Sequence, residues 1–169
     1  DLDNKKTINN YNQKLKLLEK RASEDVAQKK ELLKEKEVVE KAKKQLAELN
    51  QKIVEKRRKN LLKKEVEKIA DSVKKGFTEK DILQILEKVA DGIITEEEAK
   101  RLLKEKTDLS DDNIRKIIAK TKSIQKDSEI LSEKLATASS EEIEEILRDA
   151  GGVSETDILA LVEKKKEVE

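Results

Sequence analysis

Apolar residues recur in alternating steps of three and four along the first 75 residues, a segment without Gly or Pro. One run comprises Ile8, Tyr11, Leu15, Leu18 and Ala22. The spacing returns in two later runs, at Val39, Ala42, Leu46, Leu49 and Ile53 and at Leu62, Val66, Ile69 and Val73. It is typical of the a and d positions of a coiled coil. We therefore predict a long, coiled-coil-like helix over residues 1–75.

This apolar pattern is not continuous. Ile8 and Val39 are 31 residues apart, which is four heptads plus three residues. A shift of three residues indicates a local change in the coil or a turn. It falls between Arg21 and Lys30, and the stripe thins again between Lys56 and Asn60. One helix of roughly 100 Å and a helical hairpin of half that length therefore both remain open.

An amphipathic helix of this length must bury its apolar stripe against another surface. The candidate partner-binding seam is the central run of apolar positions, Val39, Ala42, Leu46, Leu49 and Ile53. Its partner could be a second copy of the chain, a different protein or the C-terminal part of this chain. We favour a second copy and therefore expect a homo-oligomer.

The sequence after residue 75 contains a repeated pattern of helix starts. An apolar residue precedes a Ser or Thr, which acidic residues and another apolar residue follow. The five caps in this pattern are Thr78, Thr95, Ser110, Ser154 and, more weakly, Ser139. The cap hydroxyl can accept a hydrogen bond from a free backbone N–H of the first turn, and acidic residues there favour the positive end of the helix dipole. The clearest capping box is formed by Thr95 and Glu98.

Glycines mark the ends of several of these helices. Gly76, Gly92 and Gly151 stand where a left-handed residue would end the preceding helix. We therefore predict helices near residues 79–90, 96–106, 111–136, 141–149 and 155–167. The expected fold class is all-α, with a long N-terminal helix or helical hairpin over residues 1–75 and a bundle of about five helices over residues 76–169.

Composition narrows the functional classes. The chain has no Cys and no His, so it lacks the usual zinc ligands and the residues of Ser-His-Asp and Cys-His catalysis. Charged residues make up 46% of the chain with a net charge of +1, a balance that gives no general attraction to nucleic acid. No apolar run approaches the length of a membrane-spanning helix, which is about 20 residues. We expect a soluble, non-enzymatic protein without cofactor, metal or small-molecule substrate.

One basic cluster interrupts this balance. Lys56, Arg57, Arg58 and Lys59 are consecutive, and they could contact phosphate groups. The chain contains only one Phe and one Tyr, so aromatic side chains to stack on bases are almost absent. A solvated helix face is the simpler interpretation of this cluster.

Residues 82–103 have the sequence ILQILEKVADGIITEEEAKRLL. This segment resembles the short helical hairpin of the SHOCT family, which is found at the ends of many bacterial proteins. Gly92 to Glu98 and the basic and leucine residues from Lys100 to Leu103 fit that pattern, whereas Ala99 replaces an aromatic residue. The resemblance implies a helical hairpin that mediates contacts and carries no catalytic residues. The same stretch also resembles half of an EF-hand loop, but Val89 would occupy a ligand position, so we expect no calcium site.

The function that uses most of these signals is structural or adaptor activity through helix–helix interaction and oligomerisation. A phage or bacterial assembly component and a surface helical protein both fit, and a nucleic-acid-associated helical protein is the alternative. The start at Asp1 indicates processing or trimming, and the compartment could be cytoplasmic, secreted or virion-associated. The missing Pro, Met and Trp would also suit a designed protein, although the Asn-rich stretch near Tyr11 favours a natural one.

Overall fold

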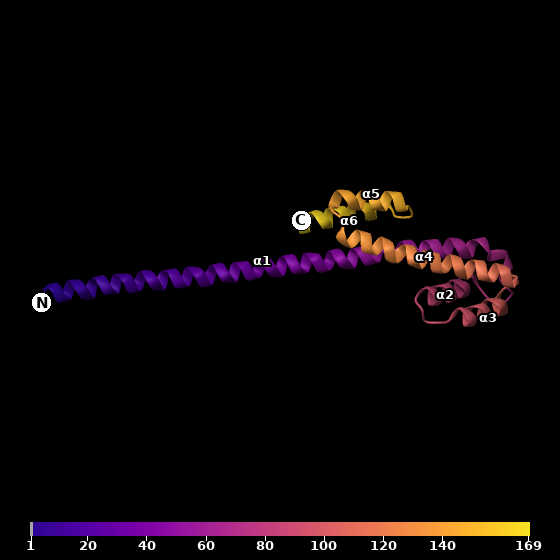
Figure 1. The fold of residues 1–169 in the computed structure, drawn as a ribbon, viewed down its shortest axis with the longest axis horizontal. Helices are drawn as coiled ribbons and strands as arrows, with labels where there is room; N and C mark the ends of the chain where they lie inside the picture. Colours follow the sequence, from indigo (N-terminus) through magenta and orange to yellow (C-terminus); the bar gives the residue numbers. More distant parts are fainter. Residues whose placement is uncertain (1) are drawn as a thin grey trace. The chain divides into compact units, whose positions relative to one another are not determined.

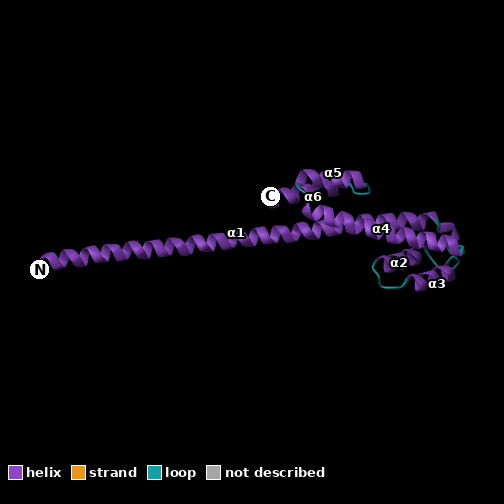
Figure 2. Ribbon diagram, viewed as in Figure 1, coloured by secondary structure: helices purple, strands orange, loops and turns teal. Residues whose placement is uncertain are grey.

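The computed structural model describes the backbone of residues 2–169 and the side chains of residues 4–169. The described elements are the long helix α1 (Leu2–Lys68), a 3₁₀ turn η1 (Ala70–Ser72) and five further helices. These are α2 (Glu79–Ala90), α3 (Glu96–Lys106), α4 (Asp111–Thr137), α5 (Ser140–Ala150) and α6 (Glu155–Val168). Figure 2 shows helices joined by short loops, and the described residues form no strand. The all-α prediction is confirmed, and the five helix ranges predicted after residue 75 agree closely with the structure.

The long helix is uninterrupted from Leu2 to Lys68, so the helical-hairpin alternative is wrong. Neither predicted break, at Arg21–Lys30 or at Lys56–Asn60, is a turn. The helix ends before Lys75 because backbone groups beyond Ile69 pair elsewhere. The Lys74 N–H donates to the Lys106 carbonyl at 2.9 Å, and the Asp108 N–H donates to the Ser72 carbonyl at 2.8 Å. These two bonds join the end of α1 to the loop that follows α3.

The chain divides into two units, Asp1–Lys44 and Gln45–Glu169. The described residues of the first unit, 2–44, all belong to α1. The second contains the rest of α1 and all the shorter helices, so it begins earlier than the boundary after residue 75 that the sequence suggested. Residues 45–68 belong to this second unit because their apolar side chains, such as Ile53 and Leu62, lie in its core.

The core of the second unit consists of two clusters. One joins Leu62 and Val66 of α1 to α2, α3 and the first half of α4. The other joins Ile53 and Val54 of α1 to the end of α4, α5 and α6. Figure 1 shows α2 and α3 near one end of α4 and α5 and α6 near the other. Within this unit, α1 and α4 therefore connect two helical hairpins, each with its own core.

The two hairpins, α2–α3 and α5–α6, carry similar residues in the same order. Thr78 and Ser139 cap their first helices, and Thr95 and Ser154 cap their second helices. The corresponding buried pairs are Ile82 and Ile143, Leu86 and Leu147, and Leu103 and Val162. Gly92 and Gly151 both have φ of 71° and follow the first helix of each hairpin, as the left-handed prediction required. The two hairpins therefore follow the same pattern of capping and buried residues.

At every predicted cap, the hydroxyl accepts a hydrogen bond from a backbone N–H of the first turn. The five caps are Thr78, Thr95, Ser110, Ser139 and Ser154. The clearest capping box, however, is not at Thr95. It is at Thr78, whose hydroxyl accepts from the Asp81 N–H at 3.3 Å while its own N–H donates to the Asp81 carboxylate at 2.9 Å. The Glu98 carboxylate instead lies 4.0 Å from Arg101 on the next turn of the same helix.

Candidate partner-binding surface

The first unit presents a row of large apolar side chains to solvent. Ile8, Tyr11 and Leu18 are 61%, 68% and 61% exposed. Leu15, Val26 and Leu33 are also exposed and lie on the same side of the helix. Burying one such side chain is worth about 1.5–3 kcal/mol. This exposed apolar row is therefore the candidate surface for contact with a partner.

We call the positions Ile8, Tyr11, Leu15, Leu18, Ala22, Val26, Lys29 and Leu33 the N-terminal stripe. Seven steps of three or four residues cover the 25 residues from Ile8 to Leu33, which averages about 3.6 residues per step. This is the period of a straight α-helix, so the stripe stays on one face without a turn. A strict heptad count from Ala22 places Asp25, three residues later, at the next position of the stripe instead of Val26. A single four-residue step after Ala22 would have placed the apolar Val26 and Leu33 on the stripe, with Lys29 as its one charged position.

The candidate seam from Val39 to Ile53 is divided between solvent and the core. Val39 is 44% exposed, Ala42 is half-buried, and Ile53 is only 3% exposed. Leu46, Leu49 and Ile53 pack in the cluster formed with α4, α5 and α6. For these three residues, the partner is the C-terminal part of the same chain, one of the three partners that the sequence left open.

Arg57 of the basic cluster is bound within the chain. Its Nε donates to the Gly151 carbonyl at 2.8 Å, and a terminal nitrogen donates to the Ala150 carbonyl at 3.0 Å. These carbonyls close α5, where the helix dipole favours a positive charge. Arg57 therefore caps the first helix of the α5–α6 hairpin.

Arg58 makes the corresponding contact with the other hairpin. Its guanidinium donates to the Asp91 carboxylate at 2.6 Å, and Asp91 is the residue that ends α2. The same nitrogen donates to Gln125 of α4 at 2.8 Å. The Nε of Arg58 is buried without a hydrogen-bond partner among the described residues. This side chain ties α1, α2 and α4 together.

The two lysines of the cluster are the more exposed members. Lys56 lies 3.4 Å from Asp157, and its side chain is 66% exposed. Lys59 lines a shallow groove with Lys63 of α1 and Lys80 and Glu79 of α2. The four residues therefore do not form one positively charged face, because both arginines bind the hairpins.

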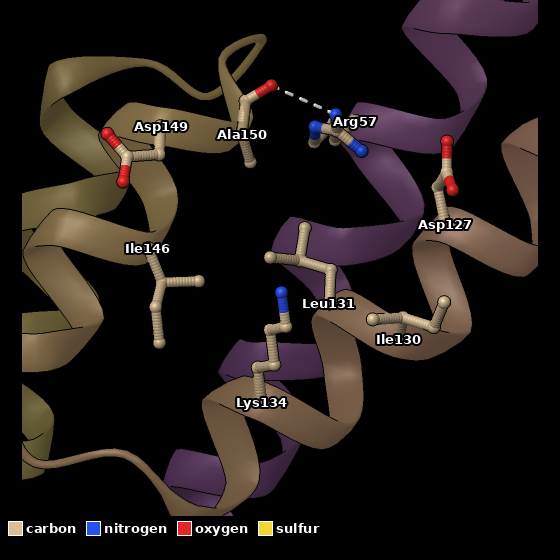
Figure 3. A pocket seen from close by; sticks show the side chains of 8 residues that line it. All are labelled: Arg57, Asp127, Ile130, Leu131, Lys134, Ile146, Asp149 and Ala150. Atoms are coloured by element: carbon tan, nitrogen blue, oxygen red, sulfur yellow. Dashed lines mark hydrogen bonds between the residues drawn. The ribbon is translucent and has the colours of Figure 1, made fainter.

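A cavity lies beside Arg57. It has a volume of about 350 Å³ and lies between α1, α4 and α5. Figure 3 shows Arg57 at its upper edge, Lys134 extending into it, and Ile146 and Leu131 on its sides. Asp127 and Asp149 belong to its rim. The hydrogen bond from Arg57 to the Ala150 carbonyl crosses the top of this cavity (Figure 3). The cavity is therefore a gap between packed helices.

Ion pairs and hydrogen bonds adjust the pKa values of a few surface groups. Glu155 and Glu144 raise the pKa of the Arg148 guanidinium, which bridges α5 to the start of α6. Hydrogen bonds from the Ser140 N–H and hydroxyl, at 2.9 and 3.0 Å, lower the pKa of the Glu169 carboxyl. Lys104 lowers the pKa of Asp111 in the same way. Except for the Glu144–Arg148 pair within α5, these interactions join the end of one helix to the end of another.

Comparisons with known proteins give no relative. No protein-family model, curated protein or solved structure matches the chain. Residues 82–103 do form a helical hairpin, α2–α3, although its kinship with the SHOCT family stays a prediction. Within the part of the chain that the structure describes, no group of acidic side chains is placed to hold a metal ion. Nor is any described helix apolar enough over a sufficient length to cross a membrane.

Proposed function

We propose that this protein is a non-enzymatic structural or adaptor protein that associates through its first helix. The N-terminal stripe is the associating surface, and the unit Gln45–Glu169 is what the association brings together. The observation that carries this proposal is the exposure of the stripe, with Ile8, Tyr11 and Leu18 all more than half exposed. A stripe of this kind on a long helix gains stability by burial against another helix.

The second unit supports this proposal by its own completeness. Its hairpins bury Leu86, Leu103 and Leu147 fully, and Arg57 and Arg58 are bonded to the ends of α5 and α2. A folded body with its core already filled needs nothing from the first 44 residues. The exposed leucines of the first unit are then available for another molecule.

The alternative, association with nucleic acid, has weaker support. Arg57 and Arg58 would be the strongest phosphate ligands of the basic cluster, but both donate to acceptors within the chain. In α4, Lys116 pairs with Asp112 and Lys122 pairs with Glu96. A phosphate backbone would have to replace these contacts before it could bind.

The proposal is tested by light scattering behind a sizing column with the full chain and two variants. The variant with Leu15→Glu and Leu18→Glu places charges on the stripe and should be monomeric where the wild type is larger. Leu17→Glu is the matched control, because Leu17 is also exposed but lies two residues, or about 200°, from Leu15 around the helix. A wild type that is monomeric at every concentration, or a stripe variant that stays associated, would remove the proposal.

A further inference from the structure

We propose that the N-terminal stripe packs against the same stripe of a second copy of this chain, parallel and in register, which makes the protein a parallel dimer. This inference rests on the proposed association and adds the number of copies and their direction. Two observations commit the occupant. One is the set of charged residues directly beside the stripe, and the other is the single lysine within it.

The stripe follows the positions of a coiled coil, with one shift of four residues between Ala22 and Val26. Its a positions are Ile8, Leu15, Ala22, Val26 and Leu33, and its d positions are Tyr11, Leu18 and Lys29. The residue before an a position is a g position, and the residue after a d position is an e position. These g and e residues border the stripe, and their charges set the orientation of a coiled coil.

Five charged residues occupy the bordering positions between Ile8 and Leu33. They are Lys14, Arg21 and Asp25 at g positions and Glu19 and Lys30 at e positions. All five are exposed to solvent. Because of this position beside the stripe, they would lie at the edges of any interface that the stripe forms.

The parallel arrangement pairs opposite charges across the interface. A g residue of one copy then lies beside the e residue that stands five positions later on the other copy. Glu19 stands five residues after Lys14, and Lys30 stands five residues after Asp25. The two-fold symmetry of the dimer repeats both pairs, so attractive contacts border the stripe on each edge.

The antiparallel arrangement pairs the same residues less well. With two stripes fully overlapped, g residues lie beside g residues and e residues beside e residues. Lys14 would still meet Asp25, but Arg21 and Glu19 would each lie beside their own copies near the middle of the overlap. Like charges across a helix interface are destabilising. Charge complementarity at the edges of the stripe therefore favours the parallel arrangement.

Lys29, the one charged residue of the stripe, favours two copies over three. A single lysine at a core position of a coiled coil specifies register and oligomer state at a cost in stability. Two ammonium groups can extend to opposite edges of a dimer, whereas a trimer would bring three together. Asp25 stands four residues before Lys29, a spacing at which opposite charges attract on a helix.

The orientation can be measured because the chain has no cysteine. Single substitutions Gln13→Cys, Lys20→Cys and Glu31→Cys place one nitroxide spin label on each copy of the full chain. All three residues are exposed f positions, which face away from the stripe. In the parallel dimer, each label lies level with its own copy. In the antiparallel dimer, the labels at residues 13 and 31 would be offset along the axis by about 22 Å and about 32 Å, at 1.5 Å per residue.

Pulsed electron spin resonance then separates the arrangements. Equal distances at all three positions in a dimer support the parallel dimer. A short distance at residue 20 with longer distances at residues 13 and 31, or a trimer in light scattering, overturns the parallel dimer but leaves association through the stripe standing. A monomer overturns both.

A charge exchange tests the pairing itself. Lys14→Glu should raise the dissociation constant of the dimer several-fold, because it places a second carboxylate beside Glu19 of the other copy. Adding Glu19→Lys to this variant should restore the wild-type dissociation constant in the parallel dimer. The control is Lys16→Glu, which makes the same change in charge on the side away from the stripe. If the double variant stays as weak as Lys14→Glu alone, Lys14 does not meet Glu19 and the parallel dimer is overturned.

Discussion

Arg57 and Arg58 are neighbours in α1, yet their side chains bind the turns of two different hairpins. Arg57 donates to the carbonyls of Ala150 and Gly151 at the end of α5, and Arg58 donates to Asp91 at the end of α2. Consecutive residues of a helix point about 100° apart, so one short segment of α1 can serve both turns. The basic cluster thus connects the two halves of the second unit.

Loss of the Arg57 contact should destabilise the second unit. Arg57→Ala leaves two helix-ending carbonyls without their donor, and we expect the free energy of unfolding to fall by about 1–2 kcal/mol. Lys56→Ala is the control, since its exposed ion pair with Asp157 should be worth less than about 0.5 kcal/mol. Urea denaturation measures both. Equal effects from the two variants would mean that the α5 carbonyls do not depend on Arg57.

A buried amide offers a stabilising substitution. The Oδ1 of Asn50 in α1 is buried and lacks a hydrogen-bond partner among the described residues. Asn50→Leu should raise the free energy of unfolding by about 1–2 kcal/mol, because it removes a desolvated polar group and improves helix propensity. Asn60→Leu, at an exposed position of the same helix, supplies the propensity part alone, about 0.5 kcal/mol. If the two gains are equal in thermal or urea unfolding, the Asn50 amide is satisfied in solution.

The two core clusters should respond independently to mutation. Leu86 and Leu147 occupy corresponding positions of the two hairpins, and both are fully buried. Each change to Ala should cost about 2–5 kcal/mol, while Leu159→Ala, at a half-exposed site of α6, should cost less than about 1 kcal/mol. Since the clusters share no side chain, the double variant should show the sum of the single costs, within about 0.5 kcal/mol. A strongly non-additive double variant would show that Leu86 and Leu147 are energetically coupled across the two clusters.

The contact between Ser140 and Glu169 should make stability depend on pH. Both hydrogen bonds favour the charged carboxylate, so the pKa of Glu169 is lower in the folded chain than its usual 4.5. The stabilisation is therefore complete above pH 4.5 and disappears as the pH falls through the lowered pKa. Glu169→Gln should be less stable than the wild type near neutral pH, and the difference should vanish in acid. Glu163→Gln, which removes the same charge from α6, should not reproduce this pH dependence in urea unfolding.

The sequence predicted the shorter helices well because most of their boundaries have a local cause. Thr78, Ser110 and Ser154 bond to their own first turns, and Gly92 and Gly151 need their positive φ at the turns where they stand. These interactions span only a few residues, so they can be recognised from the order of residues alone. The continuity of α1 was left open against a hairpin, because the two irregularities in the apolar pattern could have marked turns, although no Gly or Pro interrupts its backbone hydrogen bonds.

The candidate site was less predictable, because its parts depend on residues distant in the sequence. The role of Arg57 is set by carbonyls more than 90 residues away, and the partner of Leu46 and Ile53 is a cluster formed by α4, α5 and α6. Periodicity marked these side chains as apolar but could not say which surface covers them. The continuation of the N-terminal stripe to Val26 and Leu33 could have been found, since a four-residue step is visible in the sequence itself.

The paired arginines also restrict how α1 can change its length. Deleting one residue between Ile53 and Leu62 would rotate the helix by about 100° and shift it by about 1.5 Å, so that Arg57 and Arg58 could not both face their turns. An insertion would have the same effect. By contrast, no described side chain of residues 4–44 belongs to either core cluster of the second unit, so that unit should fold unchanged when whole turns are added or removed there. The length of α1 can therefore change by whole turns before residue 45, whereas its length after residue 45 must stay constant.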